Sequence, residues 1–157
     1  MSGDRLALIL AKQKHSYEQR TAASEEKRRR ELEKERRVQK LLESWTAAQA
    51  TLQAVIAELN RAMQANGVSL KYREEVSPAG VSRTGEVTYA QPQEYILTGL
   101  SLRLYLNSQG LLTVTILGMG RPIKNEKMKL SDFGEEVQRG WLLDLLEATA
   151  EAEAEAR

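Results

Sequence analysis

The sequence predicts an α+β fold, in which a long N-terminal helix packs on a four-stranded antiparallel meander and a second helix closes the chain. From Val38 to Met63 the apolar residues recur in steps of three and four, which is the period of a helix with one apolar face. After Asn66-Gly67 the period changes to two, which is the period of half-buried strands. Because one face of such a sheet needs a cover, we expect the long helix to provide it.

Length and composition limit the classes of protein that are possible. The chain has 157 residues, enough for one ordinary domain with a core. It contains no cysteine, which excludes disulfides and a thiol nucleophile and is compatible with the cytoplasmic location that we expect. The apolar run Leu6 to Ala11 is too short for a signal-peptide core or a membrane span. Positive charges are in excess in residues 1–40 and negative charges in residues 132–157, which suggests partners of opposite sign.

The opening segment, residues 4–17, carries four large apolar residues on roughly one side of a predicted helix. They are Leu6, Ile9, Leu10 and Tyr17. With Lys12 and Lys14 beside them, such residues suit an anionic membrane surface. The alternative is that the stripe packs on the chain's own core or on a second copy of the chain. We favour packing because the stripe is short.

The apolar stripe disappears between Thr21 and Arg37, where charged residues of both signs predominate. Pairs with glutamate four residues before arginine, such as Glu26 and Arg30, each stabilise a helix by about 0.2–0.5 kcal/mol. A helix over residues 5–65 would be about 90 Å long, longer than a domain of this size is wide. We therefore expect a partly projecting charged helical arm at residues 1–37, an α+β domain at 38–148 and an acidic tail at 149–157.

Two groups of cations are candidates for a polyanion contact. In the arm they are Arg28, Arg29, Arg30, Arg36 and Arg37, and near the C-terminal end they are Arg121, Lys124, Lys127 and Lys129. Against the arm group stand the interspersed glutamates and the lack of an aromatic residue for base stacking. The second group follows the turn Gly118-Met119-Gly120, which lacks the third glycine and the directly following helix of a dinucleotide-binding loop.

The seam of the long helix is a candidate core or interface surface. Its residues are Val38, Leu41, Leu42, Trp45, Leu52, Val55, Ile56, Leu59 and Met63. It covers about three and a half heptads, near the minimum for a coiled coil. Leu42, Ile56 and Met63 widen the face beyond the narrow line that a two-stranded coiled coil needs. We therefore expect the seam to cover the sheet, with oligomerisation, for example as a homodimer, as a secondary role.

Four strands are predicted from alternation. They are Val68–Arg73, Glu86–Tyr89, Tyr95–Leu106 and Leu112–Ile116, with a loop at Glu74–Gly85, a turn at Pro92 and a hairpin loop at Asn107–Gly110. Residues 121–129 are interpreted as an irregular basic loop. Asp132 and Glu135 form a possible capping box for a final helix through Leu146, and the Ala-Glu repeat from Ala148 is expected to fray.

The sequence offers no pattern typical of an active site. The one histidine, His15, has no second metal ligand or serine at a suitable spacing, and adjacent carboxylates such as Glu74 and Glu75 do not converge. We expect no enzyme activity, cofactor, metal or small-molecule substrate. The leading hypothesis is a non-enzymatic protein-protein interaction module that assembles with itself or with another protein. The alternative is nucleic-acid or anionic-surface binding through the arm and the 121–129 loop.

Overall fold

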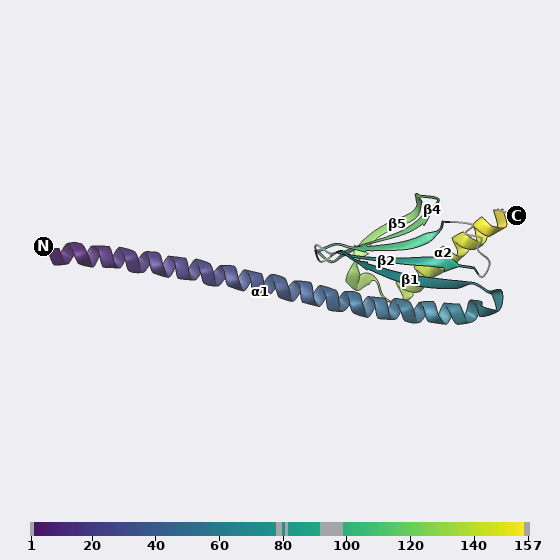
Figure 1. Ribbon diagram of the computed structural model, residues 1–157, viewed down its shortest axis with the longest axis horizontal. Helices are drawn as coiled ribbons and strands as arrows, with labels where there is room; N and C mark the ends of the chain where they lie inside the picture. Colours follow the sequence, from purple (N-terminus) through teal and green to yellow (C-terminus); the bar gives the residue numbers. More distant parts are fainter. Residues whose placement is uncertain (1, 78–79, 81, 92–98, 156–157) are drawn as a thin grey trace. The chain divides into compact units, whose positions relative to one another are not determined.

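The computed structural model describes residues 2–77, 80, 82–91 and 99–155 (Figure 1). In chain order the elements are α1 (Ser2–Met63), the 3-10 turn η1 (Gln64–Asn66), β1 (Ser69–Val76), β2 (Arg83–Ala90), β3 (Ser101–Leu106), β4 (Leu111–Gly118), β5 (Arg121–Lys129), the 3-10 turn η2 (Leu130–Asp132) and α2 (Glu135–Glu155). The predicted α+β fold class is confirmed, with five strands instead of four. The chain divides into two compact units, Met1–Lys40 and Leu41–Arg157.

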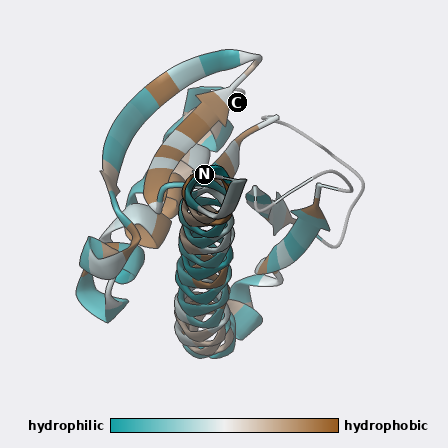
Figure 2. Cartoon of the chain, turned by 90° about the vertical axis from the view of Figure 1, so that its left-hand side faces the viewer, coloured by the Kyte–Doolittle hydropathy of each residue, from teal (hydrophilic) through white to brown (hydrophobic). Residues whose placement is uncertain are grey.

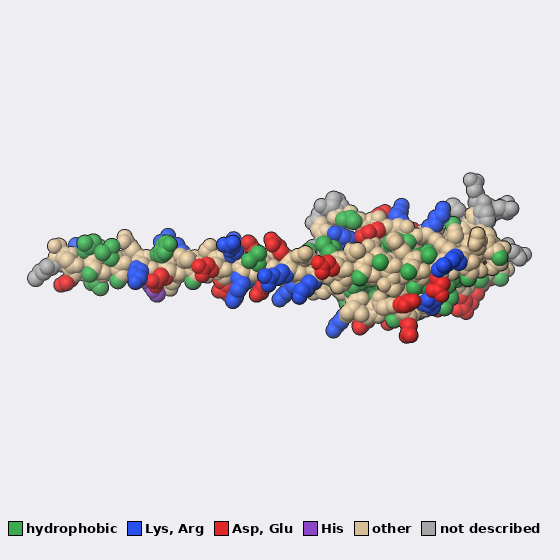
Figure 3. All heavy atoms as spheres, turned by 90° about the horizontal axis from the view of Figure 1, so that it is seen from below, with side chains coloured by type: hydrophobic (Ala, Val, Ile, Leu, Met, Phe, Trp, Pro, Cys, Tyr) green, Lys and Arg blue, Asp and Glu red, His purple; other side chains and the backbone are tan. Residues whose placement is uncertain are grey.

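The first unit is helical throughout its described part, and every side chain from residue 2 to residue 37 is exposed. Figure 3 shows hydrophobic side chains near the N-terminal end of α1, followed by intermixed basic and acidic ones. Of the glutamate-arginine pairs expected there, Glu26 and Arg30 approach to 3.0 Å, and Arg29 lies 3.9 Å from the same Glu26 carboxylate. Such exposed pairs and good helix formers support the helical backbone in the absence of a buried face.

The helical segment α1 and η1 ends at the predicted stop signal, Asn66-Gly67. Gly67 adopts a left-handed conformation with φ of 71°, and its N–H donates to the carbonyl oxygen of Gln64 at 3.1 Å. A glycine takes this conformation without the Cβ penalty of other residues. The helix therefore ends in one tight turn, and the chain enters β1 directly.

The five strands form an antiparallel meander in sequence order. Figure 2 shows hydrophobic and hydrophilic residues alternating along the strands. The register aligns the apolar residues of neighbouring strands, so that Val87 faces Leu102, which faces Ile116. The buried residues of this inner face are Leu70, Val87, Leu102, Leu104, Leu106, Leu112, Val114 and Ile116. The other face carries polar side chains, as expected for a sheet covered on one side.

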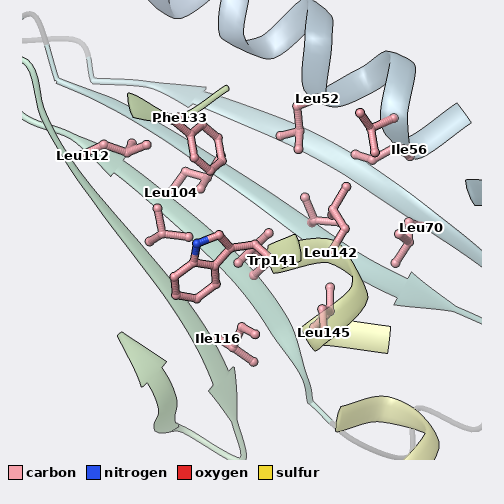
Figure 4. Packing of buried hydrophobic residues seen from close by; sticks show 14 of the residues in the cluster. Leu52, Ile56, Leu70, Leu104, Leu112, Ile116, Phe133, Trp141, Leu142 and Leu145 are labelled. Carbon is pink, nitrogen blue, oxygen red and sulfur yellow. The ribbon is translucent and has the colours of Figure 1, made fainter. Parts of the chain in front are cut away.

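The seam of α1 covers the inner face of the sheet. Within it Trp45, Leu52, Val55 and Ile56 are buried, while Leu41, Leu59 and Met63 are partly buried against the same core. Figure 4 shows Leu52 and Ile56 pointing from α1 toward the sheet.

Two residues of the predicted seam, Val38 and Leu42, are half-buried. Burial of each large apolar side chain contributes about 1.5–3 kcal/mol to the free energy of unfolding. The buried residues of the seam are therefore a main source of stability for the second unit.

The second cover of the sheet is α2. Trp141, Leu142 and Leu145 are buried, and Figure 4 shows them among the leucine and isoleucine side chains of the strands. The helix begins at Glu135, after Gly134, so the predicted capping box at Asp132 is wrong. The reason is that residues 130–132 form η2, which buries Leu130 and leads into the buried Phe133. The segment expected to fray from Ala148 is helical as far as Glu155.

The main correction concerns residues 121–129, which form the edge strand β5 and not an irregular loop. Almost all its residues are exposed because it lies at an edge of the sheet, so it lacks the apolar alternation by which the other strands were recognised. The register shifts near Pro122, opposite the step from Ile116 to Leu117.

Strand limits differ elsewhere as well. β1 and β2 extend into the predicted loop at Glu74–Gly85, and the hairpin loop at Asn107–Gly110 is confirmed. β3 begins at Ser101 and not at Tyr95; residues 95–98 and the turn at Pro92 lie outside the described residues.

The packing of the α1 seam on the sheet can be tested with Leu52→Ala, because Leu52 is fully buried in the seam. Its truncation should lower the free energy of unfolding by about 2–5 kcal/mol. Urea unfolding followed by the fluorescence of the buried Trp45 and Trp141 measures this change. Leu32→Ala, on the exposed first unit, should change it by less than about 0.5 kcal/mol. Equal small effects at both positions would contradict the packing described above.

Candidate functional surfaces

The arm cations predicted to contact a polyanion are all exposed on α1. Arg29 and Arg30 share the carboxylate of Glu26, whereas Arg28, Arg36 and Arg37 form no ion pair with a described residue. Glutamates alternate with these arginines along the same helical stretch, so the local field is weaker than the arginine count suggests.

The second predicted cation group is divided by the geometry of β5. A residue of β5 lies on the inner face of the sheet where its partner on β4 does. Lys124 pairs with the buried Ile116 and therefore lies on the inner face. Lys127 and Lys129 pair with Thr113 and Leu111 and therefore lie on the outer face. Arg121 follows the turn and pairs with Gly118. The four cations thus do not form one patch.

Lys124 has structural partners on α2. Its ammonium group forms an ion pair with Asp144 and lies 4.2 Å from the ring centroid of the buried Trp141. A cation over an indole face is stabilised electrostatically. These two contacts hold α2 against β5 and take Lys124 out of the group available to an anionic partner.

The outer face of the sheet carries a shallow depression of about 200 Å³. Its lining residues are Arg73, Glu75, Thr84, Gly85, Glu86 and Arg103. The Arg103 guanidinium lies 3.4 Å from the Glu86 carboxylate, and Arg73 lies 3.2 Å from Glu75. Each arginine there is already paired with an acid, Arg103 across two strands and Arg73 within β1. We therefore interpret the depression as a group of surface ion pairs and not as an anion site.

Polar contacts between α1 and β1 were not predicted. The Trp45 indole N–H donates to the Glu74 carboxylate at 2.9 Å. The Asn60 amide donates to the carbonyl oxygen of Leu70 at 3.0 Å and accepts from the Leu70 N–H at 2.7 Å. Tryptophan and asparagine within an amphipathic seam were the available signal, but their partners lie too far along the chain to be read from spacing.

Tyr72 of β1 is half-buried and bonds to α1. Its hydroxyl accepts a hydrogen bond from the Gln49 amide at 2.7 Å. Burial raises the pKa of Tyr72 above its ordinary value of 10.0, while the Gln49 contact opposes the shift. Burial likewise raises the pKa of Tyr89, beside Glu153. Both hydroxyls are therefore neutral hydrogen-bonding groups at neutral pH and not bases.

A surface ion pair joins α2 to α1. The Arg139 guanidinium lies 2.7 Å from the Glu58 carboxylate and 3.5 Å from that of Glu135. The hydrogen bond from Arg139 lowers the pKa of Glu58, and the same contact raises the pKa of Arg139. These shifts have a structural cause and do not indicate a catalytic carboxylate.

Gln138 is a fully buried polar residue of α2 that sequence reasoning missed. Its amide nitrogen donates to the carbonyl oxygens of Ala48 at 3.0 Å and Phe133 at 3.1 Å. Its amide oxygen has no hydrogen-bond partner in the described part of the chain. Because both donors are used, the side chain ties α1, η2 and α2 together, at the cost of one unpaired acceptor.

The described residues contain no group of three or more histidine, aspartate or glutamate side chains that could hold a metal ion. None of the helices that the structure describes combines the length and apolar character needed to cross a lipid bilayer. No protein-family model matches the chain, and no curated protein matches it.

The role of Gln138 can be tested with Gln138→Glu. A carboxylate would face two carbonyl oxygens without donors, so unfolding free energy should fall by about 3 kcal/mol or more at pH 7. Burial raises the pKa of the new carboxyl, so the loss should be smaller at pH 4, where the acid is protonated in the folded state and mostly protonated in the unfolded state. Urea unfolding at both pH values measures this. Gln53→Glu, on the exposed side of α1, is the matched control, and an equally small effect of both changes would refute the assignment.

Tyr72 predicts a loss of stability in alkaline solution. Its pKa is higher in the folded than in the unfolded state, so its contribution is complete below about pH 10 and is lost as the pH rises through the folded value. Tyr72→Phe should make this decline shallower in urea unfolding between pH 9 and 11. At pH 7 it should cost about 1 kcal/mol through the lost Gln49 contact, whereas Tyr105→Phe on the outer face should cost less. An unchanged alkaline decline would contradict this account.

Proposed function

We propose that the protein is a non-enzymatic assembly module, and that the apolar stripe at the start of α1 binds a second copy of the chain. The observation that carries the proposal is the exposure of this stripe. Leu6, Ile9, Leu10 and Tyr17 are 56%, 44%, 54% and 67% exposed. Residues at this spacing lie on one side of a helix, so a partner can cover them together.

Helix energetics support a partner for this stripe. Within the first unit no apolar side chain from residue 2 to residue 37 is buried. Most helices obtain their stability from packing of an apolar face, and isolated helices in water are marginal. Burial of the stripe against another helix would add a packing contribution to the stabilisation that ion pairs and helix propensity provide.

The charges that follow the stripe favour a protein partner over a membrane. A membrane-surface helix has a polar face dominated by lysine and arginine. Residues 25–37 instead mix glutamate with arginine and lysine, so a neighbouring helix of the same sequence can offer both signs. A second copy of the chain carries such a helix by definition.

A second candidate, nucleic-acid binding, has one observation in its favour. Arg28, Arg36 and Arg37 are exposed and form no ion pair with a described residue. Nucleic-acid binding through them would weaken steeply with added salt. Failure of the chain to bind heparin at low salt would eliminate this candidate.

Self-association can be tested with Leu10→Ser, because Leu10 lies on the stripe. The loss of buried leucine area should weaken the dimer about tenfold or more in sedimentation equilibrium. Leu8→Ser is the matched control, since Leu8 is 65% exposed but lies on the opposite side of the helix. The control should change the dissociation constant less than about twofold. A wild-type chain that stays monomeric up to about 1 mM would contradict self-association.

A further inference from the structure

Among the described residues, β5 has a strand partner on one side only. In the described part of the chain β4 is its neighbour in the sheet, and no hydrogen bond from a described residue reaches its other side. β5 has nine residues, longer than the usual strand of about five or six. Natural proteins commonly shorten or cover such edges, or place lysine, proline or a bulge on them, because unpaired N–H and C=O groups accept a further strand. β5 carries lysines, Pro122 and a register shift, so only a strand of suitable charge can pair with it.

The opposite edge of the same sheet, β1, is covered in part by α1. Asn60 binds both the N–H and the carbonyl oxygen of Leu70, and Trp45 donates to Glu74. Figure 1 shows the C-terminal part of α1 running alongside β1, with β5 at the other edge. The sheet thus has one edge that α1 covers in part and one that is open among the described residues.

The side chains of β5 determine which strand could pair with it. Lys127 and Lys129 are exposed on the outer face, and neither forms an ion pair with a described residue. Like charges directly opposite each other destabilise a strand pair, whereas opposite charges stabilise it. A second β5 strand is therefore disfavoured, and a strand with acidic residues on this face fits. On the inner face Met128 packs against the core, which favours an apolar residue opposite it, whereas Glu126 on the same face is exposed.

The length of the available edge is limited by Pro122, which has no N–H, and by the shift in register beside it. The regular part, Lys124–Lys129, spans about 20 Å. Because side chains alternate between the two faces, a segment that pairs here would alternate acidic with apolar residues.

We propose that the edge of β5 binds, by strand addition, an extended acidic segment of a partner protein in which acidic and apolar residues alternate. Main-chain hydrogen bonds would supply affinity and the lysines would select the charge. The acidic end of the chain itself is not this segment, because it is helical to Glu155 within α2. The proposal does not depend on self-association of α1.

The test uses the full chain and a fluorescein-labelled peptide of eight residues that alternates valine with glutamate, measured by fluorescence anisotropy. The peptide should bind, and a peptide that alternates valine with lysine should not. N-methylation of one alternate set of peptide nitrogens should abolish binding, while methylation of the other set should leave it nearly unchanged, because only one side of an added strand faces β5.

Charge variants locate the site. Lys127→Glu/Lys129→Glu should weaken binding of the glutamate peptide about tenfold or more and should allow the lysine peptide to bind. Lys71→Glu/Arg73→Glu, which makes the same change of net charge on β1, should leave the affinity nearly unchanged. Circular dichroism checks that both variants keep their secondary structure.

Three outcomes would overturn the proposal. The first is no binding of the glutamate peptide by the folded wild-type chain. The second is equal binding of both N-methylated peptides, which indicates attraction by charge alone. The third is equal loss of affinity in the β5 and β1 variants. Displacement of the peptide by single-stranded DNA together with insensitivity to N-methylation would identify a nucleic-acid surface instead.

Discussion

The apolar inner face of the sheet is the constraint on which the rest of this structure depends. Leu102, Leu104 and their neighbours on the adjacent strands form a continuous apolar surface that is stable in water only when covered. The seam of α1 and the helix α2 share this task, and Gln138 joins them by donating to a backbone carbonyl of α1. The same packing places Asn60 and Trp45 against β1. The helix that covers one face therefore also bonds to part of the β1 edge.

The sequence predicted those elements whose structure depends on residues that are near in the chain. The seam and the inner faces of β1 to β4 follow the periods of a helix and a strand, and Gly67 ends α1 where its left-handed conformation allows. β5 lacks such a period because an edge strand exposed on both faces needs no apolar side. The predicted capping box at Asp132 failed because burial of Leu130 and Phe133 outweighed a local capping signal.

The candidate surfaces were predicted less completely, for a related reason. The sequence indicated cations at positions 121–129, but their grouping required the wrong assumption of a loop. In a strand, neighbouring residues point to opposite faces, so Lys124 contacts Trp141 while Lys127 and Lys129 face outward. The partners of Gln138 and Asn60 were out of reach as well, because a polar side chain does not reveal a distant backbone group with which it bonds.

The helix α1 carries two different apolar surfaces. Its seam from Leu41 to Met63 is wide and is buried within the second unit, whereas the stripe from Leu6 to Tyr17 is narrow and exposed. Between them lies a charged stretch that holds a helical backbone without burying any side chain. Because that stretch has no apolar stripe, it does not compete for either surface. The wide seam can therefore stabilise the second unit while the narrow stripe stays exposed, as the proposed assembly module requires.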